Sequence, residues 1–117
     1  MRLSEVTFTD AQPIDGYGPG FFRVGGEVAQ APVCVHPGGA FDWGGYDDTA
    51  SLLTLTSEID VLFVGTGAET AHVPAAFRET IEAAGIGVEP MNSPAAARTY
   101  NVLVSEGRRV AAALLGV

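Results

Sequence analysis

The sequence contains no lysine: its six basic residues are all arginines, and they face fourteen acidic residues, which gives a formal net charge of −8. Without lysine the chain has no Schiff-base amine, no lysine for a pyridoxal cofactor, no phosphate-loop lysine and no Ser/Lys dyad. Nucleic acids and anionic membrane surfaces both attract clustered positive charge. The composition therefore excludes several enzyme mechanisms and argues against nucleic acid as a partner.

Cysteine and long apolar runs are also scarce. Cys34 is the only cysteine, so no internal disulfide forms and the fold does not depend on an oxidising compartment. Apolar runs such as Val61 to Val64 are far shorter than the about 20 residues that span a bilayer. Residues 1–10 resemble neither a signal peptide nor a transit peptide. We therefore expect a cytoplasmic protein without an integral membrane segment.

The length of 117 residues shows no break in composition and predicts a single domain over 1–117. Its content of 47% apolar residues is enough to fill a hydrophobic core without a metal or disulfide. The order of apolar runs and turn signals predicts an α/β fold whose neighbouring strands run parallel. We therefore treat the whole chain as one folding unit.

The first half of the chain predicts extended structure. Three short stretches are rich in β-forming residues: Leu3 to Phe8, Phe21 to Val24 and Pro32 to His36. Turn-forming glycines and a proline precede the second stretch, and Gly25-Gly26 follows it as a two-residue turn would. This half therefore predicts an N-terminal β-hairpin.

The stretch from Pro37 to Gly45 holds four glycines and one proline in nine residues, which predicts an ordered loop rather than a regular element. Phe41 and Trp43 can anchor this loop. Aromatic residues are frequent at binding hot spots, so Phe41, Trp43 and Tyr46 are candidate contacts for a protein partner. The alternative is that Trp43 closes the core.

The second half alternates strands and helices. Asp47-Asp48-Thr49 can cap a short helix, and the fully apolar run within Asp60 to Gly65 predicts a central strand buried on both faces. Later signals predict a helix starting near Pro74, with Phe77, Ile81 and Ala84 on one face and Gly85 at its end, and then a strand over Ile86 to Met91. A second helix is predicted with Ser93 as N-cap and Pro94 next; Ala96, Tyr100 and Leu103 form its apolar face, and it ends at Gly107. The composition of Arg109 to Leu115 fits a strand or a helix, and the alternation of units favours a strand.

Gly65-Thr66-Gly67 directly follows the most apolar strand. In open α/β sheets, ligands favour the carboxyl ends of strands, so this loop is a candidate site for an anion or small ligand. It lacks the third glycine of a dinucleotide fingerprint and the lysine of a phosphate loop. The alternative is a tight turn in which glycines permit unusual dihedral angles.

A second candidate is the polar cluster between Arg98 and Arg108. On a helix Arg98 and Asn101 share one side with Ser105, and Glu106 and Arg108 lie at its end. If this end met the glycine loop, Arg108 could hold an anionic group and Glu106 could act as an acid or base. The alternative is that these side chains satisfy neighbouring backbone groups.

No metal or cofactor is expected. Cys34 and His36 alternate along one strand and point to the same face, but nothing in the sequence brings further ligands to them. Cys34 lies in an apolar stretch that raises a thiol pKa, which disfavours a nucleophilic role. With no catalytic motif present, we expect a non-catalytic protein.

Five stretches of the chain resemble the sequence of a known family. They are the strand ending in Gly65-Thr66-Gly67, the Gly85-Ile86 step, Ser93-Pro94-Ala95-Ala96, the run from Arg98 to Leu103 and the closing Glu106-Gly107-Arg108-Arg109-Val110. Together they resemble the small Mth-type α/β domain family of unknown function. The likeness covers nearly the whole chain, although Ser93 stands where threonine is common in the family.

The resemblance implies a three-layer α/β fold with a mixed central sheet and no established catalytic activity. Members include a mitochondrial respiratory complex I assembly factor and an adipogenesis-associated protein. The resemblance therefore favours a cytoplasmic binding or scaffold protein that acts through protein partners and assists complex I assembly. The alternative is a ligand-binding protein or undescribed enzyme at the glycine loop and the Asn101, Glu106 and Arg108 helix end. The oligomeric state stays open, a homo-oligomer included.

Overall fold

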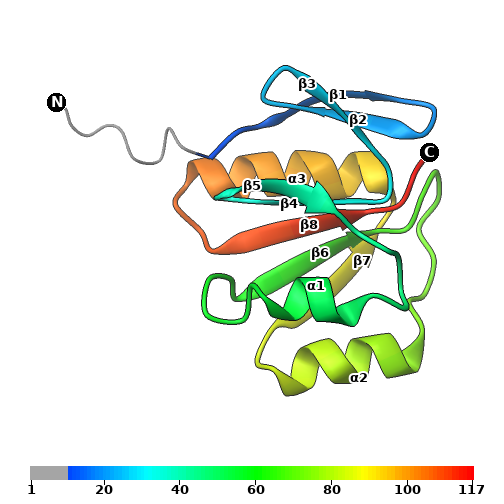
Figure 1. The fold of residues 1–117 in the computed structure, drawn as a ribbon, viewed down its shortest axis with the longest axis vertical. Coiled ribbons are helices and arrows are strands. Elements are labelled where there is room, and N and C mark those ends of the chain that lie inside the picture. The colour runs from blue at the N-terminus through cyan, green and yellow to red at the C-terminus, as the bar shows by residue number, and fades with distance from the viewer. Residues whose placement is uncertain (1–10) are drawn as a thin grey trace, which may run out of the picture.

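The computed structural model describes residues 11–117, which form three layers (Figure 1). The extended segment predicted over Leu3 to Phe8 lies outside these residues. The elements follow one another as β1 (Ile14–Gly18), β2 (Phe21–Val24), β3 (Glu27–Gln30), β4 (Val33–His36), β5 (Gly39–Asp42), α1 (Thr49–Leu53), β6 (Val61–Gly65), α2 (Ala75–Ala83), β7 (Gly87–Met91), α3 (Ser93–Ser105) and β8 (Val110–Leu114).

The middle layer is a mixed five-stranded sheet in the order β5-β4-β8-β6-β7. Strand β6 runs parallel to both β7 and β8, as the alternation of strands and helices predicts, whereas β4 is antiparallel to β5 and β8. The middle strand is β8, every residue of which is buried, and β6 lies beside it rather than at the centre. The apolar composition of both strands follows from their burial on two faces.

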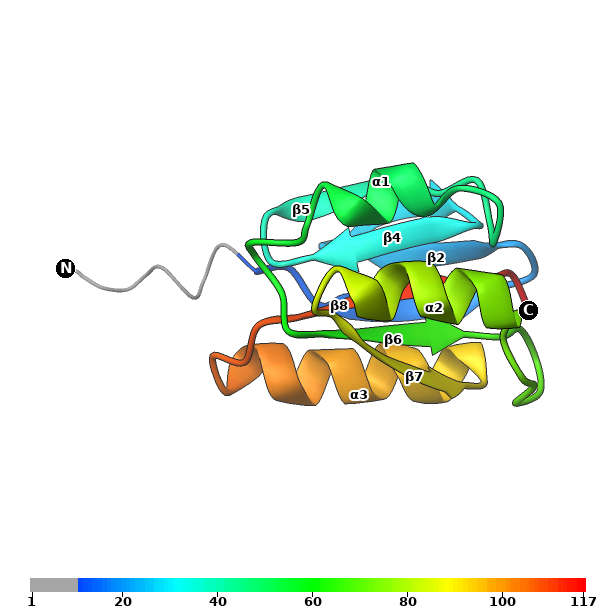
Figure 2. The same cartoon turned by 90° about the horizontal axis from the view of Figure 1, so that it is seen from below.

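Two hydrophobic clusters fill the spaces on either side of this sheet. One lies under α1 and α2 and includes Cys34, Leu52 and Ile81. The other lies under α3 and the small sheet β1-β2-β3 and includes Phe22, Val35 and Tyr100. Cys34 and Val35 fall on opposite sides because successive strand residues point to opposite faces. Figures 1 and 2 show α1 and α2 on one face and α3 with the small sheet on the other.

The predicted loop from Pro37 to Gly45 is wrong in its middle part. Residues Gly39 to Asp42 form β5, the edge strand of the large sheet, paired with β4 from His36↔Gly39 to Val33↔Asp42. Pro37-Gly38 forms the two-residue connection between the two strands. The glycines and proline mark the hairpin ends, which is why composition alone suggested an irregular segment.

The N-terminal hairpin is confirmed and larger than predicted. Gly25 and Gly26 have φ of 58° and 87°, the positive values required of both central residues in a type I′ turn, and they join β2 to β3. Strand β1 adds a third strand and includes Gly16 and Gly18, two of the glycines that precede Phe21 and that predict a turn there. Pairing with β2 extends this segment despite its glycine content.

The helix signals are correct to within one residue. Asp48 caps α1, and Gly85, with φ of 88°, follows α2, whose N-cap is Pro74. The N-cap of α3 is Asn92, whose side chain accepts from the Ala95 N–H at 2.8 Å, and not Ser93 as predicted. Ser93 is instead fully buried in the first helical turn, where it makes different contacts.

Candidate functional site

The predicted glycine loop meets the start of α3 through the hydroxyl of Ser93. The Ser93 Oγ accepts from the Gly67 N–H at 2.9 Å and donates to the Leu115 carbonyl at 2.7 Å. In return the Ser93 N–H donates to the Gly67 carbonyl at 2.7 Å. One side chain therefore joins the segments that follow β6 and β8 to the first turn of α3.

Gly65 and Thr66 are equally engaged. A Cβ on Gly65 would lie 2.6 Å from Ser93 Oγ and 2.9 Å from the Ser93 Cα, so only glycine fits against the helix. The Thr66 N–H donates to the Met91 carbonyl at 2.9 Å, and the Thr66 hydroxyl donates to the Glu69 carbonyl at 2.6 Å. The glycines here serve close packing between strand, loop and helix.

The junction of Gly65, Thr66, Gly67 and Ser93 has little left to offer an anion. Anion sites in glycine loops depend on free backbone N–H groups. Here the N–H groups of Thr66 and Gly67 are already committed to internal acceptors. Ligand binding at this loop stays a prediction, and the geometry favours the tight-turn alternative.

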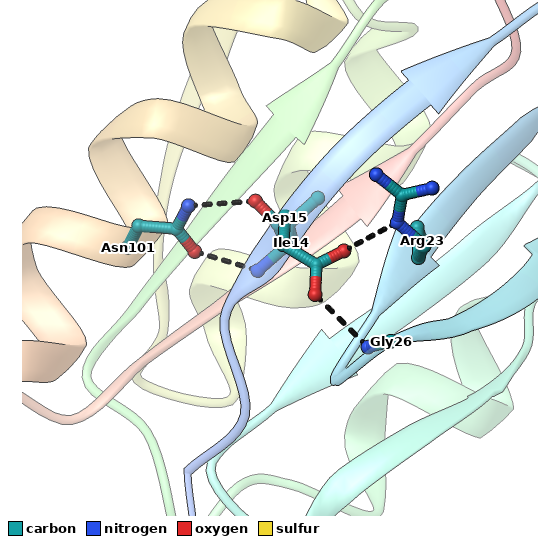
Figure 3. A network of polar contacts seen from close by, with 5 residues as sticks. All are labelled: Ile14, Asp15, Arg23, Gly26 and Asn101. Carbon is teal, nitrogen blue, oxygen red and sulfur yellow. Dashed lines mark hydrogen bonds and ion pairs between the residues drawn. The ribbon is translucent and has the colours of Figure 1, made fainter.

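Asn101 holds the small sheet against α3. Its Oδ1 accepts from the Ile14 N–H and its Nδ2 donates to the Ile14 carbonyl, both at 2.8 Å (Figure 3). On the far side of the same strand, Asp15 accepts from Arg23 Nε and from the Gly26 N–H, both at 2.9 Å. Asn101 therefore satisfies backbone groups, the alternative considered from sequence, and fixes the entry of β1.

The structure does not bring the two predicted halves of the cleft together. Gly67 lies at the first turn of α3, whereas Glu106 is the C-cap at its other end and Arg108 follows. The 13-residue helix separates these ends by about 20 Å. Glu106 and Arg108 are exposed, so the single cleft proposed for an acid or base and an anion clamp is not formed. Sequence proximity along a helix does not place its two ends on one site.

Arg98 lies apart from both halves. It is exposed on the outer side of α3, where it lines an open hollow of about 400 Å³ together with Thr99, Val102 and Leu103. Val102 is 55% exposed and contributes an apolar side chain to this hollow. This hollow is shallow and mixes one cation with apolar side chains.

Of the three candidate aromatic contacts, Trp43 belongs to the core. It is 2% exposed, its ring packs against Phe77 with centroids 6.0 Å apart, and its Nε1–H donates to the Asp48 carbonyl at 3.0 Å. Tyr46 and Phe41 are half-buried and pack on the edge of the same cluster. Trp43 therefore closes the core, and only its two neighbours reach the surface.

The segment that follows Trp43 is fixed by Asp48. Its carboxylate accepts from the Gly44 N–H at 2.9 Å and from the N–H and hydroxyl of Ser51 at 3.1 and 2.7 Å. The Gly44 backbone bond and those from Ser51 lower the pKa of Asp48. The carboxylate therefore stays charged while it orders the approach to α1.

An open hollow of about 310 Å³ lies between β5 and α1, a feature that sequence analysis missed. Its lining residues are Phe41, Asp42, Ser51 and Thr54. The hydroxyls of Ser51 and Thr54 already donate to Asp48 and to the Ser51 carbonyl. Only the recognition of Gly39 to Asp42 as a strand would have placed Phe41 and Asp42 at a sheet edge.

The buried titratable groups are inert rather than activated. Burial raises the pKa of the Cys34 thiol to about 12, which disfavours the nucleophilic thiolate, and it also raises the pKa of Tyr100. Burial lowers the pKa of His36, partly opposed by Glu58. Within residues 11–117 no three of the His, Cys, Asp and Glu side chains gather as a metal site would require.

Comparison with known proteins identifies the family. Residues 14–115 match the family described as a protein of unknown function (DUF498/DUF598). The chain belongs to this family. The match takes in the small sheet, the large sheet and all three helices, so the family is defined by the whole fold rather than by one loop.

Two relatives illustrate the range of the family. An uncharacterized protein of Rhodobacter capsulatus is 50% identical, with 98% of this chain and 93% of the relative covered. NADH dehydrogenase [ubiquinone] 1 alpha subcomplex assembly factor 3 of Danio rerio is 37% identical over 87% of this chain. That match covers 63% of the zebrafish protein, so this chain spans less than two thirds of its length.

Solved structures of similar chains share the fold. A crystal structure described as an outer membrane protein from Bartonella henselae has a TM-score of 0.82 at 35% identity, covering 91% of this chain and 95% of that one. A solution structure of a Bordetella pertussis protein, described as a Mth938-like domain, has a TM-score of 0.75 at 31% identity, covering 99% and 92%. These neighbours confirm the expected Mth-type fold. Among residues 11–117 no helix is long and apolar enough to cross a bilayer.

Proposed function

We propose that this protein is a non-catalytic binding factor that assists the assembly of respiratory complex I through protein contacts. The observation that carries the proposal is the 37% identity to the zebrafish protein named NADH dehydrogenase assembly factor 3, which extends over 87% of this chain. Fold alone is weak evidence of function, and this sequence identity supports the proposal beyond the shared fold.

The arrangement of the polar groups supports a binding role. Asn101, Thr66 and Ser93, which a catalytic cleft would have to draw on, are engaged in bonds that hold the fold together. The groups still open to a partner lie at the surface, beside Phe41 and along the outer side of α3. The single buried cysteine suits a reducing compartment, and we place the protein's action in the cytoplasm.

Gene replacement in Rhodobacter capsulatus tests the proposal, because that organism carries a relative 50% identical to this chain. The gene for the relative is deleted, and this chain, with an affinity tag, is expressed in its place. Deletion should lower the amount of intact complex I on native gels and the NADH:ubiquinone oxidoreductase activity of membranes. This chain should restore both and should co-purify with complex I subunits.

A tagged Ser93→Ala chain, which should destabilise the fold, serves as the negative control, and a Glu79→Ala chain, changed at an exposed position of α2, as the neutral surface control. Unchanged complex I levels after deletion, with no complex I subunit enriched over a tag-only purification, would contradict the assembly function. A restored strain whose purified protein carries a discrete small-molecule mass in native mass spectrometry would instead favour a ligand-binding role.

A further inference from the structure

The described residues have four sheet edges, and two of them are blocked. On β7, Pro90 lacks an N–H and interrupts any further strand. On β1, the backbone of Ile14 is occupied by Asn101. The remaining edges, β3 in the small sheet and β5 in the large sheet, carry neither device. An open edge is a template for pairing with another chain, so these two edges are the ones to consider.

The register shows which backbone groups of β5 are free. The Trp43 N–H donates to the Pro32 carbonyl at 3.1 Å, which makes this a hydrogen-bonded pair. Antiparallel pairs alternate, so Phe41 and Gly39 also bond to β4, and the N–H and C=O groups of Ala40 and Asp42 point away from the sheet. Both residues are exposed, and no other residue from 11 to 117 bonds to their backbone.

A hollow beside β5 can receive a side chain of an added strand, and this distinguishes β5 from β3. The hollow of about 310 Å³ between β5 and α1 is lined by the half-buried Phe41, whose side chain faces α1, and by Asp42, Ser51 and Thr54. The Asp42 side chain lies on the other face of the strand, opposite Val33. Every second residue of an added strand would point to this side of the sheet. The aliphatic stem of an arginine or lysine can lie on the Phe41 ring while its charged head stays in water.

Charge selects the occupant. Residues 33–60, which build β4, β5, α1 and the connection to β6, contain neither arginine nor lysine. They carry five carboxylates, of which Asp60 is paired with Arg109 at 3.3 Å; the other four are Asp42, Asp47, Asp48 and Glu58. A second copy of this chain pairing edge to edge would bring two such segments together, and like charges opposite one another are destabilising. A basic segment is complementary to the same surface.

We propose that the β5 edge binds an extended, basic segment of a partner protein, which adds to the large sheet as a sixth strand and places an arginine or lysine over Phe41. This inference rests on the proposed function and deepens it, since it specifies where and how a partner is held. Backbone bonds to Ala40 and Asp42 supply affinity, and the acidic side chains around the edge supply the preference for basic residues.

The test uses fluorescence anisotropy with a labelled nine-residue peptide of alternating valine and arginine. Ala40→Pro removes an outward N–H without touching the bonds to β4 and should weaken binding about tenfold or more. Val28→Pro, which removes the equivalent outward N–H on β3, is the matched control and should bind like the wild type. Asp42→Asn should weaken binding by a smaller factor, and a valine/glutamate peptide should not bind.

A second measurement does not depend on the folding of any variant. The valine/arginine peptide with N-methyl groups on alternate residues cannot complete the edge ladder and should fail to bind wild-type protein. Equal binding of the methylated peptide, equal binding by Ala40→Pro and wild type, or no saturable binding of the parent peptide at millimolar concentration would each overturn the proposal. Complex I subunits that co-purify equally with Ala40→Pro and wild-type chains would overturn it while leaving the assembly function standing.

Discussion

The glycine-loop junction and the β5 edge differ in how far their polar groups are used. At the junction, the N–H groups of Thr66 and Gly67 and both polar groups of Ser93 find partners within the chain. At the edge, the backbone groups of Ala40 and Asp42 have no partner among residues 11–117. The loop carried the familiar signature of a ligand site, whereas the edge was hidden in an apparent loop.

The comparison teaches that a binding surface is recognised by unsatisfied groups rather than by residue type. Glycines at the end of a buried strand allow either a ligand or a helix to approach closely. Here a helix does so, with Ser93 in contact distance of any atom added to Gly65. If the junction is closed and the edge is open, substitutions at buried or internally bonded residues should destabilise the fold more than substitutions at the edge.

Trp43 is expected to give the largest effect, because it lies directly after β5 yet is buried in the core. Trp43→Ala should lower the free energy of unfolding by about 3 to 5 kcal/mol. Phe41→Ala, on the exposed edge two residues earlier, should cost clearly less because Phe41 is only half-buried. Urea unfolding followed by circular dichroism measures both. Similar losses for the two variants would show that the edge is as tightly packed as the core.

Ser93→Ala tests the closed junction and should have the next largest effect. It leaves the Gly67 N–H and the Leu115 carbonyl without their partner, at a cost of about 2 to 4 kcal/mol. Ser105→Ala is the matched control on the same helix, since its exposed hydroxyl donates only to the Val102 carbonyl. Chemical denaturation of the two variants in parallel gives the comparison. If Ser93→Ala had nearly the same free energy of unfolding as wild type, the Ser93 hydroxyl would not be what holds the junction together.

Asn101→Ala should have an intermediate effect, because it frees both backbone groups of Ile14. We expect a loss of about 1 to 2 kcal/mol in the free energy of unfolding. Amide hydrogen exchange should quicken across β1 and β2 while β6 and β8 stay protected. Unchanged exchange in β1 would show that pairing with β2 alone, without the clamp, holds the strand in place.

Substitution of Asp48 should have the smallest effect on stability, and that effect should depend on pH. Its folded-state pKa is lowered by the bonds from Gly44 and Ser51, so the stability it contributes is present above the unfolded value of about 3.9 and is lost as pH falls through the lower folded value. Asp48→Asn should therefore be less stable than wild type at pH 7, and the difference should shrink below pH about 4.

Urea unfolding of wild type and Asp48→Asn at neutral and acidic pH measures this difference. The adjacent Asp47→Asn makes a matched control, since it removes a neighbouring charge outside the hydrogen-bonded cap. A stability gap that stays constant with pH would argue that the carboxylate acts only through its shape.

Much of the fold could be predicted because its strongest signals are local. The apolar run of β6 follows from burial on two faces, and Gly85 ends α2 through its positive φ. Strand β5 could not be predicted in the same way, since its pairing with β4 is tertiary and its glycines suggest a loop. The Asn92 cap differs by one residue from prediction because Ser93 is suited to either position.

The candidate site was harder to predict because it depends on distances in space. Arg98, Asn101, Glu106 and Arg108 are close in sequence, but α3 spreads them along its length and around its surface. The chain gives no sign of which backbone groups remain unpaired until the register of β4 and β5 is known. Resemblance identified the fold correctly, since the fold depends on the whole pattern rather than on one contact.

The position of β8 has a consequence for how the protein is made. It is the last strand in the chain, yet it lies between β4 and β6 and pairs with both. Until residues 110–114 leave the ribosome, the β4-β5 hairpin and the β6-β7 pair have no shared strand. The hairpin and the parallel pair therefore remain separate halves of the large sheet until β8 is inserted between them, so its insertion must be a late step in forming that sheet.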